Sequence, residues 1–208
     1  MAREQFDREL KELRESLLRM AGLLESQIGD AVDALRRRDR SLAEKVRRED
    51  QSMNESFRQI REQAMVVIST QAPVARDLRN LMGVLYIASE LERMGDYAVR
   101  IARMTSTLCG LPDRPLRAEF GLMGELAIEQ DEPRARDIAA RDDEIDRLYH
   151  RVFDDIIEEV AKGTDSEGAL RAVTLMLVAH NLERIGDRVT NVAEDIVFLE
   201  TGQVVELG

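Results

Sequence analysis

The sequence predicts an all-α protein made of two tandem three-helix bundles, and three observations lead to this prediction. Apolar residues recur at steps of three and four over nearly the whole chain, which is the period of an amphipathic helix. Three of the four prolines lie between residues 112 and 133, so the helices are interrupted near the middle of the chain. A Leu-Glu-Arg-apolar-Gly-Asp motif occurs at 91–96 and again at 182–187, so the second half repeats the first.

The composition excludes several classes of function. The 208 residues include 41 acidic and 30 basic side chains, and the resulting net charge of −11 argues against nucleic-acid binding. One cysteine and two histidines exclude a disulfide framework, a four-cysteine zinc site and a three-histidine zinc site within one chain. No window reaches the roughly 18 apolar residues of a membrane span, and no apolar leader precedes the first helix. We therefore expect a cytoplasmic protein.

The first bundle is expected to occupy residues 1–110. Ser41 fits the N-cap of its second helix, with Glu44 in the capping-box position. Pro73 is expected at the start of the third helix, where its fixed φ is tolerated. Glycine and prolines at 110–115 end this unit. The expected helices cover residues 4–38, 41–71 and 73–108.

The second bundle is expected to occupy residues 111–208. Its middle helix should stop at Lys162 and Gly163, and Ser166 fits the N-cap of its last helix. That helix should end at Thr201 and Gly202. The expected helices cover residues 115–130, 133–161 and 167–200.

A basic segment lies at the turn between the first two helices. It allows two interpretations: a solvated tip of a helical hairpin, or a docking patch for an acidic partner or an anionic membrane face. The residues are Arg36, Arg37, Arg38, Arg40, Lys45, Arg47 and Arg48.

Paired acids lie on the apolar stripes of the third and sixth helices. Glu92 takes a heptad position whose neighbours are apolar, and Asp96 follows one turn later. Glu183 and Asp187 repeat this arrangement, and His180 precedes them on the same side. Carboxylates that point into a bundle must be protonated, paired with arginine or bound to a cation.

The second and fifth helices supply further oxygen ligands. Asp142 and Asp146 are four residues apart, whereas Asp50 is followed by Asn54. If these helices face the paired acids, each bundle gathers about four oxygen ligands, which suits magnesium, calcium, manganese or iron, with zinc as a further candidate. The alternatives are ion pairs with Arg93 or Arg184 and a solvated acidic face. Gly95 and Gly186 fit either close helix packing or room beside a metal.

Several segments resemble the PhoU family. They lie at 71–79 and 88–99 in the first half and at 181–187, 191–194 and 200–205 in the second, so the resemblance covers essentially the whole chain. It implies two three-helix bundles and a cytoplasmic regulator of phosphate uptake rather than an enzyme. Family members act with the phosphate ABC transporter and a membrane sensor histidine kinase, and they repress phosphate-starvation genes when phosphate is plentiful. The resemblance further implies peripheral membrane association through these partners, and a homodimer.

The same resemblance implies multinuclear iron or zinc clusters held by acidic-x-x-x-Asp motifs. Two departures from the family pattern concern the first cluster. Asn54 replaces an acid, and Arg100 stands where the family has asparagine, so that its guanidinium can substitute for a cation beside Asp96. The second cluster is therefore expected to hold metal better. The implied ligands are Asp50, Glu92 and Asp96 for one cluster, and Asp142, Asp146, Glu183 and Asp187 for the other.

Two other functions remain open from the residues alone. One is a ferritin-like di-metal carboxylate oxidase. That class needs Glu-x-x-His on two helices, and neither acidic motif here continues to a histidine. The other is a plain scaffold whose buried acids pair with arginine.

Overall fold

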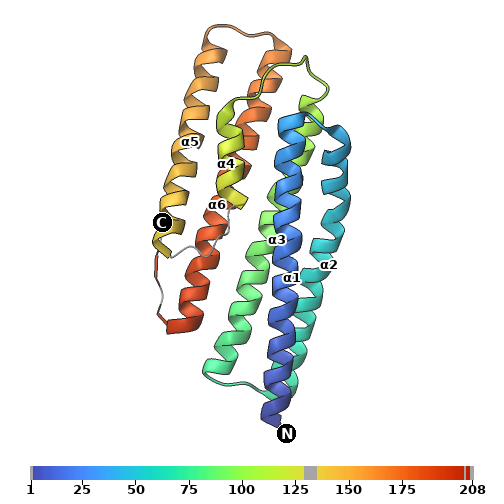
Figure 1. Cartoon of the computed structure of the whole chain (residues 1–208), viewed down its shortest axis with the longest axis vertical. Helices are drawn as coiled ribbons and strands as arrows, with labels where there is room; N and C mark the ends of the chain where they lie inside the picture. Colours follow the sequence, from blue (N-terminus) through green and yellow to red (C-terminus); the bar gives the residue numbers. More distant parts are fainter. Residues whose placement is uncertain (1, 129–134, 204, 207–208) are drawn as a thin grey trace.

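The computed structural model describes residues 2–128, 135–203 and 205–206, and these residues form six helices and no strands (Figure 1). The predicted all-α class is confirmed. In chain order the helices are α1 (Ala2–Arg37), α2 (Arg40–Gln71), α3 (Arg76–Leu108), α4 (Ala118–Ile128), α5 (Ala135–Ala161) and α6 (Ser166–Thr201). None of the six combines the length and apolar character needed to cross a lipid bilayer.

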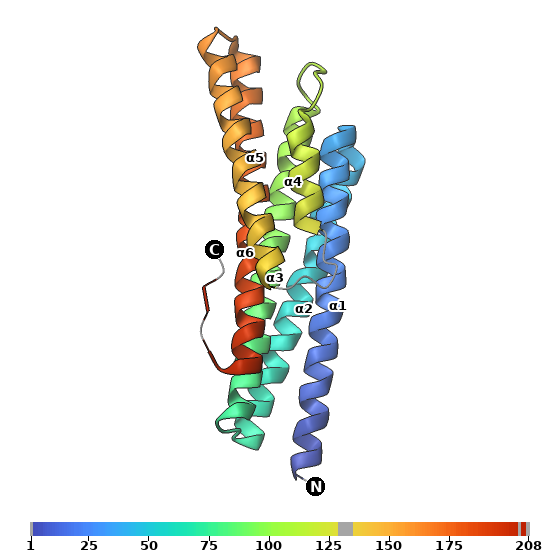
Figure 2. The ribbon, with the colours of Figure 1, turned by 60° about the vertical axis from the view of Figure 1, so that its left-hand side comes forward.

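The helices pack as two groups of three, which meet chiefly through α3 and α6 and also through α1 and α4. Helices α1, α2 and α3 pack against one another, and α4 packs with α5 and α6. The most extensive contact in the molecule joins α3 to α6, which lie side by side in both ribbon views (Figures 1 and 2). The expected boundary at residue 110 falls in the connection between α3 and α4. The two groups share one apolar core cluster.

Two helix starts differ from the sequence prediction in the same way. Asp39, not Ser41, caps α2: its Oδ1 accepts a hydrogen bond from the backbone N–H of Leu42 at 3.0 Å. Asp165, not Ser166, caps α6, and its Oδ1 accepts from the N–H of Gly168 at 2.8 Å. Both aspartates have extended backbone, which leaves the carboxylate free to reach the first turn, whereas both serines already lie inside the helix.

The start of α3 was also predicted wrongly. Pro73 does not begin the helix, because Ala72 and Ala75 on either side of it have positive φ values of 44° and 48°. A left-handed residue cannot continue an α-helix, so α3 begins only at Arg76.

The fourth helix begins three residues later than the expected residue 115, since its described part covers Ala118–Ile128. Residues 129 and 130, and the expected start of the next helix at 133, lie outside the described residues. The expected ends of α5 and α6 are confirmed, with Gly163 and Gly202 at φ 97° and 74° immediately beyond them.

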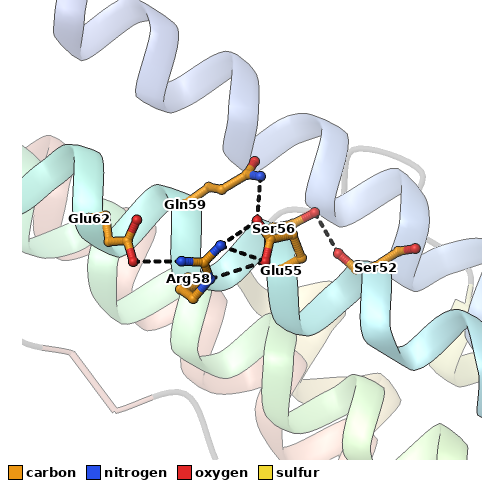
Figure 3. Close-up of polar contacts among 6 residues, drawn as sticks. All are labelled: Ser52, Glu55, Ser56, Arg58, Gln59 and Glu62. Carbon is orange, nitrogen blue, oxygen red and sulfur yellow. Dashed lines mark hydrogen bonds and ion pairs between the residues drawn. The ribbon is translucent and has the colours of Figure 1, made fainter.

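On the exposed face of α2, carboxylates pair with basic and amide side chains of the same helix (Figure 3). Arg58 pairs with Glu55 at 2.7 Å and with Glu62 at 2.9 Å, and the amide of Gln59 donates to Glu55 at 2.7 Å. These hydrogen bonds lower the pKa of Glu55. Exposed acids that are paired with neighbours on their own helix are typical of a solvated surface and not of a binding site.

A largely buried ion pair crosses the contact between α3 and α6. Arg188 Nη1 of α6 lies 3.1 Å from Glu90 Oε2 of α3, and the amide of Asn191 donates to the same oxygen at 3.1 Å. The Arg188 and Glu90 side chains are only 14% and 15% exposed. Removing one member of such a pair strands the other charge, which is costly.

We predict that Arg188→Met lowers the free energy of unfolding by about 3 kcal/mol, because Glu90 is left with the Asn191 amide alone. Urea denaturation would measure the loss. Adding Glu90→Gln should recover a large part of it, since no charge is then stranded. A cost of Arg188→Met well below 1 kcal/mol would contradict this account of the contact.

Candidate metal centre

Three carboxylates of the second bundle meet between α5 and α6. One oxygen each from Asp146, Glu183 and Asp187 can be chosen so that all three lie within 4.8 Å of one another. Asp146 is exposed, whereas the side chains of Glu183 and Asp187 are only 19% and 28% exposed. This group of three is close enough to hold one cation, and all its members were predicted as ligands.

Asp142, the fourth predicted ligand, lies on the same side of α5. Its Oδ1 is 3.4 Å from the position that a Cβ on Gly186 would take. This oxygen and Glu183 Oε2 are buried, and neither has a hydrogen-bond partner. His180 Nδ1 lies 3.3 Å from Glu183 Oε2, as the sequence spacing predicted. His180 is therefore the nearest potential donor to Glu183 Oε2, and two buried carboxylate oxygens with so few partners fit a cation-binding site.

The charges in this cluster are poorly balanced. Arg184 pairs with Asp187 at very short range. Burial raises the pKa of Glu183 to about 7, with a further contribution from Asp187. Burial, followed by the charges of Asp187 and Asp146, raises the pKa of Asp142 to about 6. A bound cation would offset both the cost of burying these charges and the repulsion between them.

Both repeat glycines allow close helix packing. A Cβ on Gly186 would stand 2.9 Å from Ile145 Cδ1 of α5, and a Cβ on Gly95 would stand 3.0 Å from Gln27 Oε1 and 3.2 Å from Met53 Cγ. Larger residues at either position would force the helices apart. Of the two explanations offered from sequence, close packing accounts for both glycines, and at Gly186 it also brings Asp142 next to α6.

The first bundle brings its three predicted ligands into electrostatic contact but not into a comparable group. Burial raises the pKa of Asp50 and of Glu92, and the charge of Asp96 raises both further. The Asn54 amide donates to Asp50 Oδ2 at 3.0 Å. In the described part of the chain, the close grouping of three possible ligands occurs in the second bundle alone.

Arg100 does not take the role suggested from sequence. It is exposed and lies over the ring of Tyr97, with its Cζ 5.1 Å from the ring centroid. Arg103, together with the Asn54 amide, offsets part of the increase in the pKa of Asp50 that burial and Asp96 cause. Sequence reasoning missed Arg103, although its position seven residues after Asp96 places it on the same stripe of α3.

Known proteins match this chain over almost its whole length. A family model described as the PhoU domain matches residues 17–105 and 120–196, once in each half of the chain. The chain belongs to the PhoU family. Two relatives named phosphate-specific transport system accessory protein PhoU homolog show the extent of the match. The one from Clostridium acetobutylicum is 33% identical and covers 100% of this chain and 99% of its own length. The one from Rhizobium meliloti is 36% identical, with coverages of 95% and 87%.

Solved PhoU structures share the same fold. PhoU from Pseudomonas aeruginosa superposes with a TM-score of 0.88 at 30% identity, covering 95% of this chain and 100% of that one. The phosphate transport system regulatory protein PhoU from Streptococcus pneumoniae gives a TM-score of 0.84 at 26% identity, with coverages of 97% and 99%. The resemblance stated from the sequence motifs is thereby confirmed.

We predict that the metal-free protein loses stability as pH rises through the window from about 4.5 to about 7. The folded-state pKa of Glu183, about 7, lies above the ordinary glutamate value of 4.5, so the folded state binds more protons within this window. Glu183→Gln should flatten the loss and raise the melting temperature at pH 8 by about 2–4 °C, equivalent to roughly 1 kcal/mol.

Differential scanning calorimetry in the presence of a chelator would measure both effects. Glu25→Gln is the matched control, because Glu25 is exposed and the substitution removes the same charge. Equal changes in the two variants would show that Glu183 experiences only the net charge of the protein.

Proposed function

We propose that this chain is an accessory regulator of phosphate transport. The observation that carries the proposal is full-length similarity to proteins named phosphate-specific transport system accessory proteins, joined to the same six-helix fold as a protein described as a phosphate transport regulator. We further propose the finer role that the sequence motifs imply. The chain would connect the phosphate ABC transporter to a membrane sensor histidine kinase and repress the starvation response when phosphate is plentiful. It would work in the cytoplasm as a homodimer.

The arrangement of the helices supports an adaptor more than an enzyme. The described residues place no histidine three positions after an acid of either motif, and Arg184 pairs with Asp187 where an oxidase would need a further ligand. The names of the relatives describe accessory and regulatory proteins. Oxygen consumption by an iron-loaded sample would favour the oxidase alternative instead.

We propose that metal binding, with iron or zinc as the family implies, belongs chiefly to the second cluster. Asp146, Glu183 and Asp187 lie close enough to hold one cation, and Asp142 adds a further buried carboxylate oxygen to this oxygen-rich set. In the first cluster, Asp50, Glu92 and Asp96 remain candidate ligands. There Asn54 and Arg103 satisfy part of the charge that a cation would otherwise balance.

We predict that the pair Glu183→Ala and Asp187→Ala removes most of the metal that co-purifies with the protein, whereas Glu92→Ala with Asp96→Ala removes the smaller part. Elemental mass spectrometry on both variants would decide the order, with circular dichroism to confirm that each is folded. Isosteric Glu183→Gln with Asp187→Asn repeats the test without cavities. Greater loss from the first-cluster variant would overturn the assignment.

In living cells we predict that deleting the gene switches on a phosphate-starvation reporter in phosphate-rich medium, and that restoring the chain represses it again. The physical reason is that the kinase would no longer receive the state of the transporter. Crosslinking from isolated membranes would show whether the transporter, the kinase or both are bound. A reporter that stays repressed after deletion would count against the regulatory proposal.

A further inference from the structure

A small arginine-lined pocket lies at the end of the molecule formed by the α1–α2 turn, the α3–α4 connection and the start of α6. Its volume is about 200 Å³. Five arginines line it, together with a single acid, Asp113, from the connection. The arginines are Arg36, Arg37, Arg38, Arg114 and Arg171. So dense a group of positive charges is unexpected in a protein with a net charge of −11.

Arg171 is the most buried of the five, with 9% of the residue exposed. Its Nη2 donates to the carbonyl oxygens of Arg114 at 3.1 Å and Pro115 at 3.3 Å. In the part of the chain that the structure describes, no carboxylate lies within 4 Å of its guanidinium. Burial lowers the pKa of Arg171, and the positive charges of Arg38 and Arg114 lower it further. Its charge therefore has neutral partners but no paired anion.

Arg38 is also held over backbone carbonyls. Its Nη2 donates to Leu108 O at 2.6 Å and to Leu111 O at 2.7 Å, and its own φ is 52°. The nearest carboxylate, on Asp113, is 3.4 Å away and its side chain is 88% exposed. These contacts fasten the connection to the helices. They orient the guanidinium but do not neutralise it, because an exposed carboxylate is largely screened by water.

Arg36 and Arg114, the rim arginines, lie at the edge of the pocket. Their charges are not needed to hold the α3–α4 connection against the helices. Arg36 lies 3.7 Å from Glu125, and Arg114 lies 3.7 Å from Glu159, so both pairs exceed hydrogen-bond distance. Their side chains are about half exposed. Arg37, by contrast, pairs closely with Asp33 at 2.9 Å. A purely structural role explains the carbonyl contacts of Arg38 and Arg171, but it leaves Arg36 and Arg114 unexplained.

We propose that this pocket binds a phosphate group. Guanidinium groups stay charged at any physiological pH, and their planar forks match the oxygens of phosphate in a bidentate geometry. The volume is below the roughly 300–1,000 Å³ of pockets for drug-sized ligands, so a small and strongly charged anion fits best. The phosphate could be supplied free in solution or by a lipid headgroup. The basic turn noted in the sequence thus forms one wall of a pocket.

The pocket is separate from the acidic cluster. Arg171 precedes Glu183 by 183 − 171 = 12 residues on α6, which corresponds to about 18 Å along the helix axis. The two sites are opposite in charge, so a cation at one and an anion at the other need no common ligand. This inference rests on the arginines alone and stands whether or not the cluster holds metal.

Isothermal titration calorimetry with inorganic phosphate tests the proposal directly, with sodium chloride of equal ionic strength as the reference. Arg36→Gln with Arg114→Gln should raise the Kd for phosphate about tenfold, because two charged donors are lost at the rim. The matched control is Arg19→Gln with Arg61→Gln, which removes the same charge from exposed positions outside this pocket and outside the basic turn. The control should change the Kd less than twofold.

A second arm separates the two sources of phosphate. Vesicles of phosphatidylcholine with and without phosphatidylglycerol are floated with the full chain and with both variants. Binding to the anionic vesicles that is lost only in the rim variant, without binding of free phosphate, assigns the pocket to a lipid headgroup. The proposal is overturned if neither ligand binds at millimolar concentration, or if the control variant loses binding as much as the rim variant. Neither readout depends on the starvation reporter.

Discussion

The contact between α3 and α6 is the constraint on which the rest of the structure depends. Each of these helices also belongs to its own bundle, so each is covered on more than one side. Small residues allow the close approach: Ala88 and Ala179 are almost fully buried, and a Cβ on Gly83 would overlap the side chain of Leu199. Glu90 and Arg188 occupy the polar part of this contact. The acidic motifs therefore face the other way, toward α2 in one bundle and α5 in the other.

Because of this geometry, the two acidic clusters have the same arrangement of helices. They differ in the residue type at a single equivalent position. Asp146 and Asn54 occupy equivalent places, since each follows an aspartate by four residues in the helix that faces the motif. An aspartate there adds a third carboxylate to Glu183 and Asp187. An asparagine there donates a hydrogen bond to Asp50 instead, which removes one ligand and occupies an oxygen of another. An amide in place of the acid therefore favours hydrogen bonding within the cluster over cation binding.

Much of this could be predicted from sequence, because helical period and repeated motifs depend on local spacing. The six helices, the family and the grouping of the second-cluster acids all follow from such patterns. The caps were missed because aspartate and serine are equally good candidates at neighbouring positions, and only the backbone angles decide between Asp39 and Ser41. The start of α3 was predicted wrongly at Pro73 for a related reason. An alanine at position 75 gives no indication in the sequence that its φ is positive.

Arg171 was missed for a different physical reason. In the sequence it is a single charged residue in the apolar stretch 169–173 near the start of a helix, and the helical spacing alone does not show what covers it. Its burial arises because the α3–α4 connection crosses over it and offers two carbonyl oxygens. Local patterns cannot reveal a charge buried by a distant segment. The packing of the helices has the same consequence at the acidic cluster and at the arginine-lined pocket. Near Glu183 and near Arg171, the fold holds like charges together, and the opposite charges of Arg184 at one place and of Glu159 and Asp113 at the other offset them only in part. An ion of opposite charge would lower this repulsion at either place.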